Sequence, residues 1–291
     1  MPPLCIFVSY CSNERLFSDA LFGSLRSICA AMLGTHVFVS IGSHLYTGQP
    51  EDEAHIGWIE REFPEFEIVR YAVSPGGSTT VHPIVFHNAA RIAAVNRAMA
   101  EASSSGFWGL FLDGDEIPDA RGFTEWYNSS IIRANQRKKV MKLANYWYFM
   151  HPRLVSRDFE DSVVLAHSSV LSGAALSHPR ERDGIVLEAA TTNNEVAERD
   201  VCGLDARPMF HHYSWVRACE EDLLRKVANW GHRDDKPWAS LIKGAVALIE
   251  GGDWPSHDFV HGHTLSVMQR PVHKIAVKHN PPETLPTIQA A

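Results

Sequence analysis

Short apolar runs alternate with segments of helical periodicity along the first 116 residues of the chain. Continuous apolar runs begin near residues 4, 36, 67 and 107, and each has the length of a strand that is buried on both faces. Between these runs, apolar residues recur every three or four positions, as they do on one face of a helix. The alternation predicts βαβ units. Right-handed crossovers place such strands in one mostly parallel sheet with helices on both faces.

The pattern changes after Pro118, where strands and helices no longer alternate regularly. The periodicity predicts further helices over 122–134, 219–230 and 238–250 and further strands over 140–150, 162–171, 208–216 and 257–267. Polar residues dominate 178–207, which we expect to be a loop. The sequence therefore predicts one α/β domain made of two halves, residues 1–116 and a mixed extension over 117–279. A loose C-terminal tail is expected over 280–291.

Composition narrows the class of protein further. The chain has 27 Lys and Arg against 34 Asp and Glu, and its net charge of −7 disfavours nonspecific binding to nucleic acid. No apolar run reaches the ~18 residues of a membrane-spanning helix. The first residues also lack the basic segment of a signal peptide. The five cysteines form no C-x-x-C pair, so we expect reduced thiols and a cytoplasmic location.

Two carboxylates follow the fourth predicted strand directly, at Asp113 and Asp115. Ligands bind at the carboxyl ends of strands in open parallel sheets. Carboxylates two residues apart at such an end can converge on one Mg²⁺ or Mn²⁺ ion, which keeps positions open for phosphate oxygens. The same residues also fit an acidic turn that caps the next helix. Because the chain has neither G-x-G-x-x-G nor G-x-x-x-x-G-K-[ST], phosphates bound at this sheet need another counter-charge, and a metal ion would supply it.

Three segments give the chain a resemblance to glycosyltransferases of the GT-A fold, particularly the family-2-like enzymes. Asn13-Glu14 follows the first strand and L-D-G-D-E at 112–116 follows the fourth, and both segments are similar to stretches at these places in that family. H-Y-S-W-V-R at 212–217 resembles an H-Y-x-W-V-R segment that lies downstream in some members. The resemblance covers most of residues 4–230. It implies a GT-A-like, Rossmann-like fold and metal-dependent transfer of a sugar from a nucleotide-diphosphate sugar to a hydroxyl of a glycan or other acceptor.

The resemblance also implies roles for single residues. Asp113, Asp115 and His212 would hold Mn²⁺ or Mg²⁺ and, through it, the donor diphosphate. Residues implied to contact the donor are Ser9, Tyr10, Asn13, Glu14, Arg91, Asp113, Gly114, Arg217 and Lys226. Many family members place an acid after the second strand to read uracil. Here that strand ends in Ser40-Ile41-Gly42-Ser43, so the donor base stays open.

An inverting transfer needs a carboxylate that deprotonates the acceptor hydroxyl within hydrogen-bond reach. Asp183 is the first candidate, and Glu188 and Asp235 are the others, although none belongs to a motif. A retaining transfer needs no such base. His211 and His212 alternate on one predicted strand, so one is expected to face the core and the other the site.

Two other functions fit parts of the pattern. A metal-dependent phosphohydrolase of the haloacid-dehalogenase kind also uses aspartates after a strand. Its nucleophile normally follows the first strand, where this chain has Tyr10-Cys11-Ser12-Asn13 and no acid in that place. A non-catalytic carbohydrate-binding protein could keep the same fold. A manganese-dependent hydrolysis assay with a sugar nucleotide separates a transferase from such a scaffold.

Overall fold

The computed structural model describes residues 2–72, 83–101, 106–134, 138–193, 197–229 and 234–279. The chain divides into two compact units. Unit 1 comprises residues 1–146 and 159–212, and unit 2 comprises residues 147–158 and 213–291. These bounds differ from the two halves expected on either side of residue 116. The expected tail, 280–291, lies outside the described residues.

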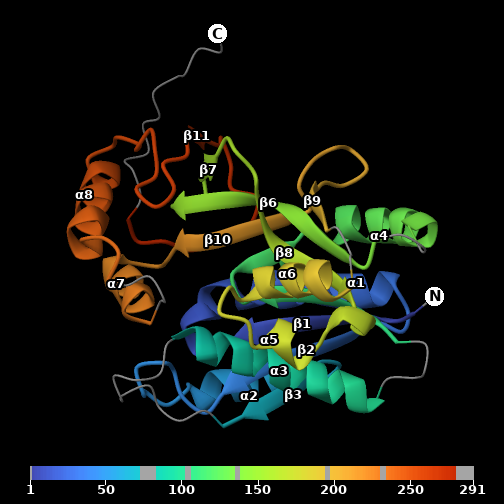
Figure 1. The fold of residues 1–291 in the computed structure, drawn as a ribbon. Helices are drawn as coiled ribbons and strands as arrows, with labels where there is room; N and C mark the ends of the chain where they lie inside the picture. Colours follow the sequence, from blue (N-terminus) through green and yellow to red (C-terminus); the bar gives the residue numbers. More distant parts are fainter. Residues whose placement is uncertain are drawn as a thin grey trace. The chain divides into compact units, whose positions relative to one another are not determined.

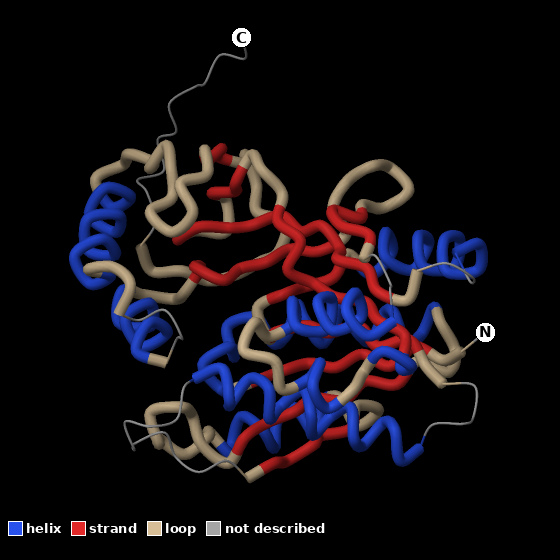
Figure 2. Tube along the Cα trace, viewed as in Figure 1, coloured by secondary structure: helices blue, strands red, loops and turns tan. Residues whose placement is uncertain are grey.

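The four predicted strands are parallel neighbours in the sheet of unit 1. Their order in the structure is β3-β2-β1-β4 (Figures 1 and 2). They are β1 (Leu4–Tyr10), β2 (His36–Gly42), β3 (Glu67–Tyr71) and β4 (Trp108–Asp113). Ser9 of β1 lies opposite Ser40 of β2 on one side and Asp113 of β4 on the other. The carboxyl ends of β1 and β4 therefore meet at one edge of the sheet, and Asp113 lies at that edge.

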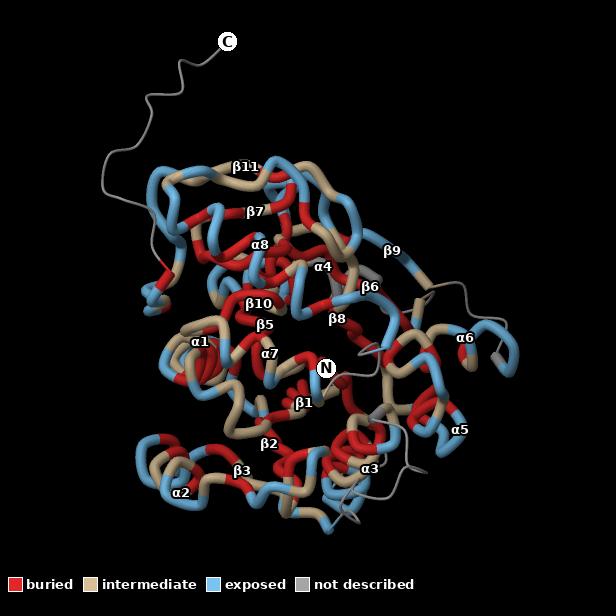
Figure 3. Tube along the Cα trace, turned by 90° about the vertical axis from the view of Figure 1, so that its left-hand side faces the viewer, coloured by how far each residue is buried: buried red, intermediate tan, exposed pale blue. Residues whose placement is uncertain are grey.

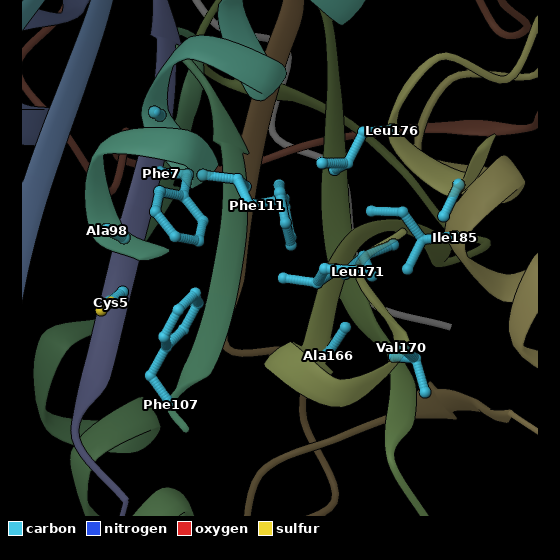
Figure 4. Packing of buried hydrophobic residues seen from close by; sticks show 14 of the residues in the cluster. Cys5, Phe7, Ala98, Phe107, Phe111, Ala166, Val170, Leu171, Leu176 and Ile185 are labelled. Atoms are coloured by element: carbon cyan, nitrogen blue, oxygen red, sulfur yellow. The ribbon is translucent and has the colours of Figure 1, made fainter. Parts of the chain in front are cut away.

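Helices cover both faces of this sheet. On one face, Phe7 of β1 belongs to a buried cluster that includes Ala98 and Ile185 from two different helices (Figure 4). On the other face, the ring of Tyr10 lies 5.4 Å from the ring of Phe22, centroid to centroid. The helices of unit 1 are η1 (Ser12–Phe17), α1 (Ser18–Ala31), α2 (Glu53–Glu62), α3 (Pro83–Glu101), α4 (Ala120–Ala134), η2 (Ser168–Val170), α5 (Gly173–Leu176) and α6 (Arg182–Asn193).

The parallel strands continue into a mostly antiparallel extension. β8 pairs antiparallel with β4, β6 pairs antiparallel with β8, and β5 pairs antiparallel with β10, whereas β6 and β9 are parallel. These strands are β5 (Glu116–Pro118), β6 (Val140–Met150), β8 (Glu160–His167), β9 (Glu198–Val201) and β10 (Phe210–Val216). The predicted α/β class, with a Rossmann-like parallel sheet between helices and a mixed extension, is confirmed.

The prediction of a loop over 178–207 is wrong, because this segment contains α6 and β9. The inward face of α6 is short and carries only a few apolar side chains, among them Ile185 and Ala189. A buried arginine, Arg182, begins the helix, so the apolar period that marks a helix is incomplete. The predicted strand over 257–267 is also shorter, and only Leu265–Val267 forms a strand, β11.

Unit 2 has a core of its own. Trp147, Phe149 and Trp215 pack in it with Trp238 and Ile242. Figure 3 shows buried residues along the strands and on the inward sides of the helices. The remaining elements of this unit are β7 (Leu154–Ser156), α7 (Glu220–Ala228), α8 (Trp238–Glu250) and β11. The aromatic side chains that follow Tyr146 on β6 are therefore packing residues.

Candidate functional site

Asp115 and His212 lie side by side in unit 1, although they are 97 positions apart in the sequence. Asp115 stands in the turn between β4 and β5, and His212 lies on β10, opposite Glu116 of β5. The Nε2 atom of His212 is 3.7 Å from Oδ1 of Asp115, and its Nδ1 atom is 3.7 Å from Oε2 of Glu160. The pairing of β10 with β5 thus brings together two of the three residues that the resemblance assigns to a metal ion.

The donor chemistry of this pair fits a divalent cation. Carboxylate oxygen suits Mg²⁺ and Mn²⁺, and imidazole suits transition metals. A ligating histidine usually directs its other ring nitrogen at a carboxylate, and Glu160 stands at that place. Burial lowers the pKa of His212, but Glu160, Glu116 and Asp115 outweigh burial, so the pKa is raised above its ordinary value. The negative field that produces this shift also favours a bound cation.

Asp113 is engaged differently from Asp115. Its Oδ2 atom lies 3.2 Å from Nη2 of Arg182, and its Oδ1 atom lies 3.7 Å from Nη2 of Arg91. Burial raises the pKa of Asp113, but the two guanidinium groups outweigh burial and hold the pKa below its ordinary value. Arg91 also pairs with Glu181 at 3.1 Å. Asp113 is therefore an ionised carboxylate that two arginines already balance.

No group of three or more His, Cys, Asp or Glu side chains is arranged to hold a metal ion in the part of the chain that the structure describes. The buried Oδ1 atom of Asp113 accepts no hydrogen bond, although Nη2 of Arg91 lies 3.7 Å away. Asp115 and His212 fit a cation as two protein donors, with further positions left to phosphate oxygens. Asp113 as a third ligand stays a prediction.

Glu116 and Arg182 are site residues that the sequence reasoning missed. Arg182 donates to both carboxylate oxygens of Glu116, with Nη2 2.9 Å from Oε1 and Nη1 bonded to Oε2. Glu116 is fully buried and also accepts the Asp113 N–H at 2.9 Å and the Ser162 hydroxyl at 2.6 Å. Its place in L-D-G-D-E was a signal for Glu116. Arg182 lies in the segment 178–207, for which the sequence predicts a loop.

The residues implied for the donor divide between the units. Ser9 lies opposite Asp113, and a Cβ atom at Gly114 would come within 3.0 Å of side-chain atoms of both Glu14 and Tyr10. These residues therefore adjoin the acidic turn, which we define as residues 113–116. The Tyr10 hydroxyl is buried and bonded to Ser18 at 2.6 Å and to His55 at 2.7 Å, and Asn13 lies on η1. Arg217 and Lys226 belong to unit 2, where Arg217 donates to the carbonyls of Tyr213 and Val216.

The three candidate bases have different surroundings. Asp183 lies in the first turn of α6, and its Oδ1 atom accepts a hydrogen bond from Lys142 at 2.6 Å. Glu188 lies five residues further along α6 and accepts a hydrogen bond from Thr192 at 2.8 Å. Asp235 is exposed in a turn of unit 2. Among these residues, Asp183 belongs to the same helix turn as Arg182.

The alternation predicted for the two histidines of β10 is confirmed. His211 is buried and its ring stacks on Tyr146, with the centroids 5.2 Å apart and the planes 21° apart. His212, its neighbour, faces Asp115 and Glu160 instead.

Comparisons with protein families and with curated sequences find no match. Among solved structures, the chain is similar to S. aureus TarS 1–349, with 12% identity over 78% of this chain and 63% of that one and a TM-score of 0.40. It is similar to the mannosyltransferase PcManGT from Pyrobaculum calidifontis in complex with GDP-Man and Mn²⁺, with 14% identity over 86% of this chain and 70% of that one and a TM-score of 0.43. Glucosyl-3-phosphoglycerate synthase from Mycobacterium tuberculosis, in complex with Mg²⁺ and UDP, matches with 12% identity over 91% and 86% and a TM-score of 0.41.

The chain spans 63% of the length of the TarS structure that it matches. At identities of 14% or less, these likenesses concern the fold and not the activity of this chain. Within the described ranges, no helix has the length and apolar character needed to cross a membrane.

Proposed function

We propose that the chain is a GT-A-type glycosyltransferase that moves a sugar from a nucleotide-diphosphate sugar to a hydroxyl of a glycan or other acceptor, with Mn²⁺ or Mg²⁺ as cofactor. The observation that carries the proposal is the approach of Asp115 to His212 at 3.7 Å, next to the sheet edge where β1 and β4 end. This edge is where ligands bind in open parallel sheets.

Each part of the site has a task in this reaction. Asp115 and His212 would hold the cation, and Glu160 would orient the imidazole. When bound, the ion neutralises the charge that develops on the departing diphosphate. Ser9, Glu14 and Gly114 are proposed to line the nucleotide, because they adjoin the same turn.

Titration of the protein with UDP-, GDP- and dTDP-sugars, with and without Mn²⁺, tests the proposal. Slow metal-dependent donor hydrolysis is expected without an acceptor. Asp115→Asn and His212→Gln are each expected to lower it by about 10²–10³-fold, the usual loss when a group that stabilises transition-state charge is removed. His36→Gln, at the exposed first residue of β2, is the matched control and should hydrolyse the donor like the wild type.

Other outcomes would favour the competing functions. Hydrolysis of simple phosphomonoesters that depends on Asp115, without sugar-nucleotide turnover, indicates a phosphohydrolase. Glycan binding with no turnover of any donor indicates a non-catalytic binding protein. Tight metal-dependent nucleotide binding that survives Asp115→Asn contradicts the proposed site.

A further inference from the structure

Arg182 links two carboxylates of the acidic turn to helix α6. Its guanidinium pairs with both oxygens of Glu116 and lies 3.2 Å from Oδ2 of Asp113. Nη1 also lies 3.4 Å from the carbonyl of Phe111, the residue two positions before Asp113 on β4. One buried side chain thus contacts β4 and β5, the strands on both sides of Asp115.

Glu116, the last residue of the turn, forms a hydrogen bond across it to Asp113. Its Oε2 atom accepts the backbone N–H of Asp113 at 2.9 Å, and its Oε1 atom accepts the Ser162 hydroxyl at 2.6 Å. The carboxylate of Glu116 therefore joins the first residue of the turn to the last. Gly114 and Asp115 lie between these two points, so the position of Asp115 depends on where Glu116 is held.

We infer that Arg182 is a positioning residue of the proposed metal and donor site, acting through Glu116 and Asp113 to hold Asp115 beside His212. The inference rests on the proposed function. It adds a residue for which the resemblance gave no role, brought to the site by a helix that the sequence did not predict.

The charges explain why arginine is needed here. Glu116 is fully buried, and a buried carboxylate without a cation is costly, so the turn must rearrange when the guanidinium is removed. The planar guanidinium pairs with both oxygens of Glu116 and at the same time with Oδ2 of Asp113. A lysine ammonium is a single point charge and lacks this planar arrangement of donors. Lysine at this position is therefore expected to replace arginine only in part.

Binding of Mn²⁺ alone, measured by the electron paramagnetic resonance signal of the free ion, tests the inference without relying on turnover. Arg182→Met is expected to bind Mn²⁺ about 10-fold or more weakly than the wild type, as loss of a residue that orients metal ligands usually does. Arg182→Lys should fall between the two. Arg121→Met, which removes an exposed ion pair with Glu125, is the matched control and should bind like the wild type.

A double variant separates positioning from folding. In Arg182→Met with Glu116→Gln, the buried charge is gone, while the glutamine oxygen can still accept the Asp113 N–H. Mn²⁺ binding about threefold or more tighter than in Arg182→Met alone is expected, because coupled neighbours are not additive. A role in folding alone would lower only the thermal stability of the variants.

Each result decides the matter. If folded Arg182→Met binds Mn²⁺ as the wild type does, the inference is overturned and the proposed function stands. If Arg182→Met does not fold, wild-type affinity in both Arg182→Lys and the double variant overturns the inference. If the wild type neither binds Mn²⁺ nor turns over a sugar nucleotide, the inference and the proposed function both fail.

Discussion

Lys142 donates a hydrogen bond from Nζ to Oδ1 of Asp183 at 2.6 Å, which joins β6 to the first turn of α6. The same ammonium lies 3.0 Å from Oδ1 of Asp161, and Arg199 pairs with Asp161 from the other side. Lys142 is buried, but the side chain of Asp183 is 49% exposed. Asp183 is therefore held in place by Lys142 and partly open to solvent.

Asp183→Asn is expected to lower the rate of sugar transfer by about 10²–10⁴-fold, because a general base usually contributes that factor. Mn²⁺ binding and donor binding should stay unchanged, since Asp183 lies outside the pair of Asp115 and His212. The rate of transfer to the acceptor and the affinity for the donor are measured separately. Glu188→Gln, on the same helix, is the comparison. A larger loss of transfer in Glu188→Gln or in Asp235→Asn would assign the base elsewhere.

Gly184→Ala is expected to destabilise the fold by about 1–3 kcal/mol, as overpacking usually does. A Cβ atom at Gly184 would lie 2.1 Å from Cβ of His178, so the start of α6 must move. Gly173→Ala on α5 is the matched control, because a Cβ atom at Gly173 would have no neighbouring atom within 4 Å. That change should be neutral or add up to about 1 kcal/mol. Urea denaturation measures both, and equal stabilities of the two variants would contradict the prediction.

Gly114→Ala is expected to weaken donor binding by about 1 kcal/mol or more, since the new methyl group would crowd Glu14 and Tyr10 at 3.0 Å. The crowding displaces the turn that carries Asp115, so Mn²⁺-dependent nucleotide affinity is the sensitive measurement. Gly23→Ala on α1, which has open space around its Cβ position, should leave this affinity unchanged. An unaltered affinity in Gly114→Ala would show that Glu14 and Tyr10 can yield without moving the site.

Glu51→Gln is expected to raise stability relative to the wild type more at pH 7 than at pH 4. Glu51 is buried, and burial raises its pKa above the ordinary value, although its Oε2 atom accepts the Ser12 N–H at 2.9 Å. A group whose pKa is raised in the folded state contributes to the free energy of unfolding. This contribution is present below the unfolded pKa of about 4.3 and is lost as the pH rises through the folded pKa. Glutamine removes that loss.

Glu53→Gln is a control that should change stability with the opposite dependence on pH, because hydrogen bonding from Arg70 lowers the pKa of Glu53. Its contribution is present above the unfolded pKa and is lost as the pH falls through the folded pKa. Glu53→Gln should therefore cost stability at pH 7 and less at low pH. The free energy of unfolding at both pH values measures the two variants, and a pH-independent difference for Glu51→Gln would refute the assignment.

The parallel sheet of unit 1 was predictable because strands that are buried on both faces leave continuous apolar runs in the sequence. β6 was also predicted with the bounds that it has, Val140–Met150. Helix α6 was not, because its first buried side chain is an arginine whose charge is balanced by Glu116, 66 residues earlier. A pairing over that distance leaves no local periodicity to detect.

Only those candidate-site residues that stand beside a local apolar pattern could be proposed from the sequence alone. Asp113 and Asp115 stand next to an apolar run and could be assigned from their spacing. His212 required the resemblance, since only the antiparallel pairing of β10 with β5 brings it to Asp115. The arginine ion pairs of Asp113 could not be anticipated, because they depend on the direction in which α3 and α6 present single side chains.

The ion pairs of Asp113 and Glu116 with Arg91 and Arg182 have a consequence for the protein when no metal ion is present. Built-in guanidinium groups already neutralise these two acids, so the apoprotein does not depend on an added cation to offset their mutual repulsion. Under the proposed function, chelators such as EDTA should abolish the metal-dependent activity and leave the melting temperature of the protein nearly unchanged. Resupplying manganese should restore activity at once, with no refolding delay.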